Sequence, residues 1–178
     1  KAFRDICDDL KILEKYEIDI PFFTQIGASA LTDKTIDVPT GGIEAGVPIT
    51  YVPFRNGIFL SITAAIAEKE GATAMYIGVV QEDSSGYPDC TDQFIQDITK
   101  AINQGTKEET KIEIITPLVH LTKAQIVEEA IKLNVPLEHT WSCYKEEEVA
   151  CGVCDSCRLR LNGFKIAGVK DPIPEKVL

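Results

Sequence analysis

Four of the six cysteines fall within residues 143–157, in the order C-x7-C-x2-C-x2-C. They are Cys143, Cys151, Cys154 and Cys157. A C-x2-C step lets one tight turn aim two thiolates at one ion, and zinc binds four thiolates at the corners of a tetrahedron. Because four sulfur ligands leave no position for water or substrate, the pattern predicts a structural zinc site rather than a catalytic one.

Disulfide bonds are the alternative for these cysteines, and the sequence alone leaves it open. The chain begins with an amphipathic, charged stretch that lacks the apolar core of a secretory signal. Cys7 and Cys90 stand apart from the cluster, as is typical of a reducing compartment. We therefore favour a metal site and a cytoplasmic protein. With only His120 and His139, the chain offers little for a histidine-based nucleophile or a catalytic metal.

The composition indicates a globular, acidic protein. The chain has 178 residues, 44% of them hydrophobic, and a formal net charge of -10 from 28 acidic and 18 basic residues. This length is enough for one hydrophobic core, and no apolar run reaches the roughly 18 residues of a membrane span. Polymeric nucleic acid is not an expected partner, because binding its phosphates needs clustered Lys and Arg.

Hydrophobic periodicity predicts alternating helices and strands. We expect helices over 1–13, 57–67, 94–103 and 121–133, and strands over 16–20, 74–80 and 111–116. The run 74–80 is continuously apolar, which is typical of a strand buried in a parallel sheet. The alternation predicts a doubly wound α/β domain with a mostly parallel sheet over residues 1–140. Residues 141–178 are expected to form a small zinc-binding appendix packed on it.

Two places in this pattern favour ligands. The strand 74–80 opens at its carboxyl end into a polar loop, 81–92, and ligands of open α/β sheets bind at that edge. Alternatively the loop is a solvated connection in which Thr91 or Asp92 caps the next helix. Asn56 is a candidate N-cap for the apolar helix, and Arg55 beside it favours an anion at the helix start. A surface carboxylate is the alternative partner of Arg55.

Three stretches together point to a family: Val52-Pro-Phe-Arg-Asn56, Ser85-Gly-Tyr-Pro-Asp89 and the four-cysteine pattern. In this order they resemble the 7-cyano-7-deazaguanine synthases of queuosine biosynthesis, and the resemblance covers essentially the whole chain. It implies a Rossmann-like, adenine nucleotide α-hydrolase-like fold of the PP-loop type, one structural Zn2+ and a homodimer. The implied reaction is an ATP-dependent ligation, accompanied by Mg2+, that turns 7-carboxy-7-deazaguanine and ammonia into the 7-cyano compound.

Matching the family's motifs implies catalytic roles for Glu82, Asp89 and Lys123. Asp89 is expected to accept the paired N–H donors of the guanine-like edge, and Glu82 to handle ammonium or its proton. Lys123 is expected to reach a phosphate or the substrate carboxylate, although an ordinary surface lysine is an equal alternative.

The resemblance also implies binding residues. Arg55 and Asn56 are expected to contact the nucleotide, and the ring of Tyr87 to stack on the flat heterocycle. The expected substrate-binding residues are Ser85, Gly86, Tyr87 and Asp89.

One departure concerns the phosphate loop. The family begins with a strand leading into Ser-Gly-Gly-x-Asp-Ser, and the 178 residues contain no match. Thr40-Gly-Gly-Ile-Glu-Ala45 lacks the final Asp-Ser and a preceding apolar strand. Lys1 aligns with a helix well inside the family's domain, so we expect the first β-α units to be missing and this chain to be inactive alone. The alternatives are another PP-loop ligase, a tRNA-modifying enzyme, or a zinc-stabilised module without catalysis.

Overall fold

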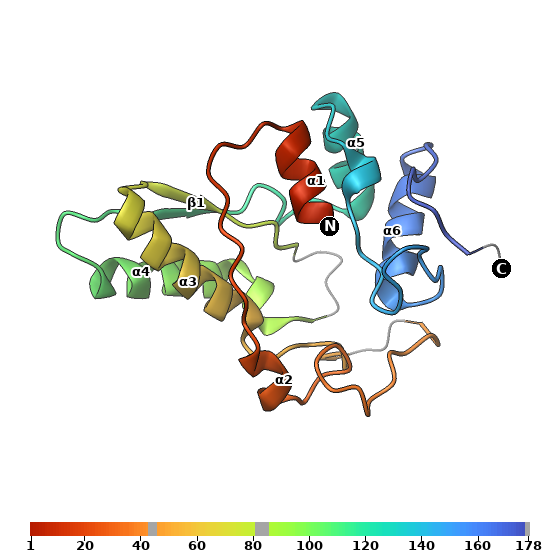
Figure 1. The fold of residues 1–178 in the computed structure, drawn as a ribbon, viewed down its shortest axis with the longest axis horizontal. Coiled ribbons are helices and arrows are strands. Elements are labelled where there is room, and N and C mark those ends of the chain that lie inside the picture. Colours follow the sequence, from red (N-terminus) through yellow and green to blue (C-terminus); the bar gives the residue numbers. More distant parts are fainter. Residues whose placement is uncertain (43–45, 81–85, 177–178) are drawn as a thin grey trace. The chain divides into compact units, whose positions relative to one another are not determined.

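The computed structural model describes residues 1–42, 46–80 and 86–176 (Figure 1). The chain divides into two compact units, one made of Lys1–Ile43 with Thr122–Leu178, the other of Glu44–Leu121. The division into residues 1–140 and 141–178 stays a prediction. Within the described ranges, no helix combines the length and apolarity that crossing a membrane requires.

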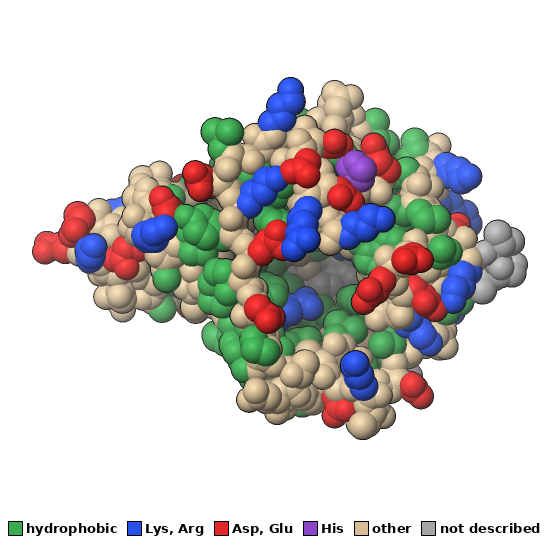
Figure 2. Space-filling view, viewed as in Figure 1, with side chains coloured by type: hydrophobic (Ala, Val, Ile, Leu, Met, Phe, Trp, Pro, Cys, Tyr) green, Lys and Arg blue, Asp and Glu red, His purple; other side chains and the backbone are tan. Residues whose placement is uncertain are grey.

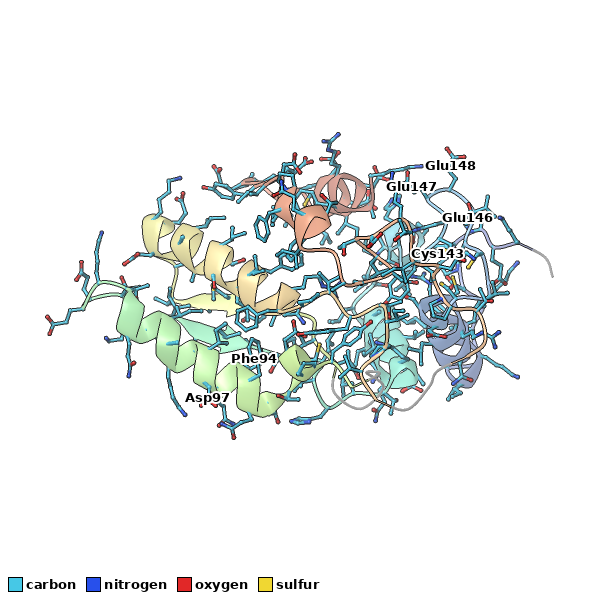
Figure 3. The ribbon with its side chains drawn as sticks, turned by 90° about the horizontal axis from the view of Figure 1, so that it is seen from below. Phe94, Asp97, Cys143, Glu146, Glu147 and Glu148 are labelled. Atoms are coloured by element: carbon cyan, nitrogen blue, oxygen red, sulfur yellow. The ribbon has the colours of Figure 1, made fainter. Side chains whose placement is uncertain are left out.

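The unit Glu44–Leu121 is built on a parallel pair of strands. β1 (Ala74–Tyr76) pairs in parallel with β2 (Glu113–Ile115), and Met75 lies opposite Ile114. Helices α3 (Arg55–Glu70) and α4 (Asp92–Gly105) cover one face of this pair (Figures 1 and 3). The predicted parallel strands are thus confirmed, although both are shorter than the apolar runs that predicted them.

The core of this unit lies between the strand pair and its two helices. Met75 and Ile114 point into it, whereas Tyr76 on the opposite face is 72% exposed, as the two-residue period of a strand requires. Each fully buried side chain such as Leu60 contributes about 1.5–3 kcal/mol. The buried members are Leu60, Ala64, Ala67, Met75, Val79, Cys90, Ile95, Ile112, Ile114 and Val119.

The helix ends of this unit follow local rules with one exception. Gly71 ends α3 in the left-handed conformation (φ 68°), and Thr91 caps α4 by accepting the backbone N–H of Phe94 at 3.2 Å. The N-cap predicted at Asn56 is wrong. α3 begins two residues earlier, at Arg55, and its N-cap is Phe54 at φ 53°, whose N–H donates to the Tyr51 hydroxyl at 2.9 Å.

The other unit contains four α-helices among its described residues, and a short 3-10 helix over Leu137–His139. The α-helices are α1 (Ala2–Asp9), α2 (Phe22–Ile26), α5 (Lys123–Lys132) and α6 (Asp155–Ile166). α5 starts where the sequence predicts, because Thr122 and Gln125 form a reciprocal capping box. α5 packs against α6 where the absent side chain of Gly163 makes room for the Lys123 backbone.

The strand predicted over 16–20 is wrong. Its residues form no strand, and Glu17 instead pairs with Arg4 on the surface. The alternation of apolar and acidic residues suggested a half-buried strand. Within the described part of this unit no strand pairs with it, so the segment stays outside any sheet and is largely exposed.

Candidate functional site

The four cysteines of the predicted metal site lie together. Their sulfur atoms all lie within 4.8 Å of one another, and Sγ of Cys151 is 3.9 Å from Sγ of Cys157. A tetrahedral ion with metal–sulfur bonds of about 2.3 Å places its sulfurs roughly 3.8 Å apart, so the spacing fits such an ion. All four cysteines are free, and a disulfide would need sulfurs about 2.05 Å apart. The geometry therefore favours the metal over the disulfide alternative.

Backbone N–H groups point at these sulfurs, as expected for thiolates. Cys143 Sγ accepts from the N–H groups of Lys145, Glu146 and Cys151, each at 3.4 Å, and Cys151 Sγ accepts from Cys154 at 3.4 Å. Gly152 takes φ 72° in the turn between them, a conformation that glycine adopts without a Cβ clash. The tight turn that the C-x2-C spacing predicts is thus present.

Burial and hydrogen bonds act in opposite directions on the thiols. Burial raises the pKa of Cys151, but N–H donors from Cys154 and Val153, together with hydrogen bonds from the thiols of Cys143 and Cys154, lower that pKa to about 7. Burial raises the pKa of Cys154 and of Cys157, whose charged forms therefore need compensation. A divalent cation held by these four cysteines would supply that compensation, because metal binding deprotonates coordinating thiols.

The C-terminal segment forms backbone hydrogen bonds with the cysteine loop. Ala150 donates its N–H to the Pro174 carbonyl and accepts from the Lys176 N–H, both at 2.9 Å. The Glu146 carboxylate beside Lys176 raises the pKa of that amine, and the thiols of Cys151 and Cys143 add to the rise. Figure 3 shows Glu147 and Glu148 directed away from Cys143, so these acids do not face the sulfurs.

A buried ion pair anchors the same tail to α6. Arg160 donates to both carboxylate oxygens of Asp171, at 2.6 and 2.8 Å, and to the Thr140 hydroxyl at 2.8 Å. Its guanidinium lies 5.1 Å from the centroid of the Phe164 ring. The sequence signal for this anchor is weak, because neither Arg160 nor Asp171 stands in a recognisable pattern.

In the other unit, the two short motifs flagged in the sequence are in contact. The Asn56 backbone N–H donates to Asp89 Oδ2 at 2.9 Å, and the Asn56 side-chain amide donates to the Asp89 carbonyl and to Cys90 Sγ, both at 3.2 Å. Asp89 is only 3% exposed. Its carboxylate therefore occupies the anion position expected at the start of α3.

Arg55 lies at the first position of α3 and is half-buried. Within the described residues no ion pair joins its guanidinium to a carboxylate, so the alternative of a surface salt bridge finds no support there. The cation remains beside the helix start, where an anionic group would be favoured.

Tyr87 lies beside the same helix start. Its hydroxyl is 3.0 Å from Oγ1 of Thr50, and its ring packs against Tyr51 with centroids 5.7 Å apart. The preceding Gly86 has φ 75°, and a Cβ there would come within 3.0 Å of the Gly46 carbonyl oxygen. Thr50 and Tyr51 were not singled out in the sequence, because they precede the recognised motif and carry no special spacing.

The remaining predicted residues are placed as follows. Lys123 is the first residue of α5 and is half-buried in the unit that holds the cysteines. Glu82 and Ser85 lie outside the described residues. The structure thus joins Asn56, Gly86, Tyr87 and Asp89 in one neighbourhood.

A small parallel sheet with covering helices defines an α/β protein, and its cluster of four thiols could hold a metal ion. The family model described as "Queuosine biosynthesis protein QueC" matches residues 1–168, and the chain belongs to this family. It is 86% identical over 176 residues to a 7-cyano-7-deazaguanine synthase of Aliarcobacter butzleri, covering 99% of this chain and 77% of the relative.

Two further relatives carry the same name. The chain is 70% identical to the 7-cyano-7-deazaguanine synthase of Nautilia profundicola and 62% identical to that of Campylobacter fetus. It covers 79% and 78% of these relatives, respectively. The resemblance identified from the sequence motifs is therefore confirmed.

Proposed function

We propose that this chain carries out the reaction for which its relatives are named, the ATP-dependent formation of 7-cyano-7-deazaguanine from 7-carboxy-7-deazaguanine and ammonia. The observation that supports this most strongly is the 86% identity over nearly the whole chain to a 7-cyano-7-deazaguanine synthase. Membership of the QueC family places the activity in queuosine biosynthesis.

The reaction needs two activations. A carboxylate resists attack because of its charge, so ATP first converts one carboxylate oxygen into part of a leaving group. Ammonia adds to the carbon, the leaving group departs, and an amide results. A second activation of the amide oxygen, followed by loss of that oxygen and two N–H protons, gives the nitrile. The protein contributes positioning and charge stabilisation, with Mg2+ accompanying ATP.

The substrate pocket is proposed at the joined motifs. Tyr87 stacks on the flat bicycle, and Asp89 accepts its N–H donors through Oδ1, since Oδ2 already accepts from Asn56. Gly86 lets the chain pass close to the Gly46 carbonyl. Two further proposed residues lie outside the described residues. Glu82 is proposed to handle ammonium or its proton, and Ser85 to line the substrate pocket.

The nucleotide and the substrate carboxylate need cations. Arg55 at the start of α3 is proposed to meet the nucleotide together with Asn56, whose backbone N–H is already held by Asp89. Lys123 at the start of α5 is proposed to bind a phosphate or the substrate carboxylate, because its ammonium group adds to the partial positive charge of the helix start.

The four-cysteine cluster is proposed to hold one structural Zn2+ through Cys143, Cys151, Cys154 and Cys157. Such an ion would link the loop 143–154 to the first turn of α6 and stabilise the small core there, which includes Ala150 and Ile173. With four sulfur ligands it supplies stability and no reaction step.

The topology of the complete sheet, the oligomeric state, the cellular location and the partners are likewise proposals. The parallel pair is proposed to be part of a doubly wound sheet, and the protein to act as a cytoplasmic homodimer on small molecules. The net charge of -10 supports the absence of a nucleic-acid partner. On the face drawn in Figure 2, Lys and Arg side chains are interspersed with Asp and Glu rather than gathered into one patch.

The test is direct formation of the nitrile. The protein is incubated with the 7-carboxy compound, ammonium and ATP. We expect the 7-cyano product by mass spectrometry. ATP binding without this product would favour another PP-loop ligase, and failure to bind ATP would favour a zinc-stabilised module.

A further inference from the structure

We propose that Thr50 is a positioning residue that fixes the Tyr87 ring for stacking on the substrate. This rests on the proposed function, which places the flat bicyclic acid against Tyr87. The inference concerns which part of Tyr87 acts: its ring face meets the substrate, whereas its hydroxyl is engaged by the protein.

The hydrogen bond between the two side chains carries the argument. Oγ1 of Thr50 lies 3.0 Å from the Tyr87 hydroxyl, and either atom can be the donor. Thr50 is only 3% exposed, so water does not compete for its hydroxyl. A buried hydroxyl without a partner is unfavourable, and this one is satisfied by Tyr87. The bond therefore fixes the far end of the Tyr87 side chain.

Two further contacts restrict the ring. The Tyr51 ring lies 5.7 Å from the Tyr87 ring at an interplanar angle of 41°. Tyr51 is itself held, because its hydroxyl accepts the Phe54 N–H at 2.9 Å. At the near end, Gly86 lies so close to the Gly46 carbonyl that a Cβ would approach its oxygen to 3.0 Å.

These contacts fix both ends of a side chain that has only two rotatable bonds. An aromatic ring held in one plane loses little conformational entropy when a flat ligand stacks on it. A ring freed at its hydroxyl end must be ordered by the ligand, which weakens binding. Thr50 therefore acts on substrate affinity through Tyr87, without contacting the substrate.

The experiment removes the two ends of the same hydrogen bond separately. Thr50→Val keeps the shape and removes the hydroxyl, and Tyr87→Phe keeps the ring and removes its hydroxyl. We expect each to raise the KM for the 7-carboxy compound about 3- to 10-fold, the range of one hydrogen bond, with kcat within about twofold. Thr50→Ser should restore wild-type KM. The double variant should be no worse than either single one, because both remove one interaction.

Thr63→Val is the matched control, since the exposed Thr63 hydroxyl donates to the Phe59 carbonyl of its own helix. Thermal melting of every variant separates loss of folding from loss of affinity. Additive effects, a Tyr87→Phe defect far larger than that of Thr50→Val, or an unchanged KM in Thr50→Val would each overturn the inference. An inactive wild-type protein would overturn the proposed function instead. In that case, NMR of ring-labelled tyrosine still tests whether Thr50→Val frees Tyr87.

Discussion

The backbone N–H of Asn56 donates to the carboxylate of Asp89 at 2.9 Å, across a separation of 33 residues in the chain. The partly positive start of α3 is therefore neutralised from within the protein by a buried carboxylate. Together with the bond from the Asn56 side-chain amide to the Asp89 carbonyl, this hydrogen bond joins the Val52–Asn56 motif to the Ser85–Asp89 motif. Any ligand that binds here meets a helix start whose orientation Asp89 already fixes.

Replacing Asp89 should separate its structural role from its binding role. Asp89→Ala leaves the Asn56 N–H buried without its acceptor, which we expect to cost about 1–3 kcal/mol in the free energy of unfolding. Asp89→Asn keeps an acceptor and should cost less stability, yet still weaken binding of the 7-carboxy compound. Urea denaturation and calorimetric titration measure the two effects. Asp97→Ala, on an exposed carboxylate of α4 (Figure 3), is the control and should change neither quantity.

Metal removal should unfold the region that the cysteines hold together. A chelator or Cys154→Ser removes the compensation for buried thiolates, so we expect amide exchange to rise over Cys154–Ile166. Elemental analysis should find about one zinc per chain in the untreated protein. Cys7→Ser is the control, because Cys7 is a buried cysteine outside the cluster. Zinc content that survives Cys154→Ser unchanged would contradict the four-sulfur site.

The buried ion pair Arg160–Asp171 should contribute far more to the free energy of unfolding than the exposed pair Arg4–Glu17. The Arg160 side chain is 12% exposed and that of Asp171 6%. Arg160→Ala leaves the Asp171 carboxylate buried and unpaired, a loss of about 3–5 kcal/mol in unfolding free energy. Arg160→Lys should not restore the stability, because only a guanidinium bonds both carboxylate oxygens in one plane. Arg4→Ala, which breaks the exposed pair with Glu17, should leave the denaturation midpoint unchanged. Equal effects of the two alanine variants would be evidence against this anchor.

A methyl group at Gly163 should disturb the contact between α5 and α6. Its Cβ would lie 2.8 Å from the Lys123 Cβ and 3.1 Å from the Lys123 carbonyl carbon, closer than packed atoms allow. We expect Gly163→Ala to destabilise the protein by about 1–3 kcal/mol and to raise the KM for whichever ligand Lys123 meets. Gly105→Ala is the matched control, since its Cβ would meet no atom within 4 Å. A melting temperature unaffected by Gly163→Ala would contradict this prediction, because α5 and α6 would then accommodate the methyl group without loss of stability.

The sequence by itself determined the structures in which the interacting residues lie within a few positions of each other in the chain. The C-x2-C steps predict the thiol cluster, and the starts of α4 and α5 follow from Thr91 and Thr122, each of which accepts a backbone N–H three residues ahead. Such contacts are fixed by local geometry, so residue type and spacing are enough to find them.

Only the tertiary structure decided how distant segments meet. Residues 16–20 look like a strand, but a strand forms only where another backbone offers hydrogen bonds, and spacing within one segment cannot reveal that partner. The N-cap of α3 is Phe54 rather than the predicted Asn56, and the Phe54 N–H donates to the Tyr51 hydroxyl. The Asn56 N–H donates to the Asp89 carboxylate instead. Thr50 and Tyr87, 37 residues apart, carry no shared pattern, because a single hydrogen bond across folded segments leaves no periodic trace in the chain.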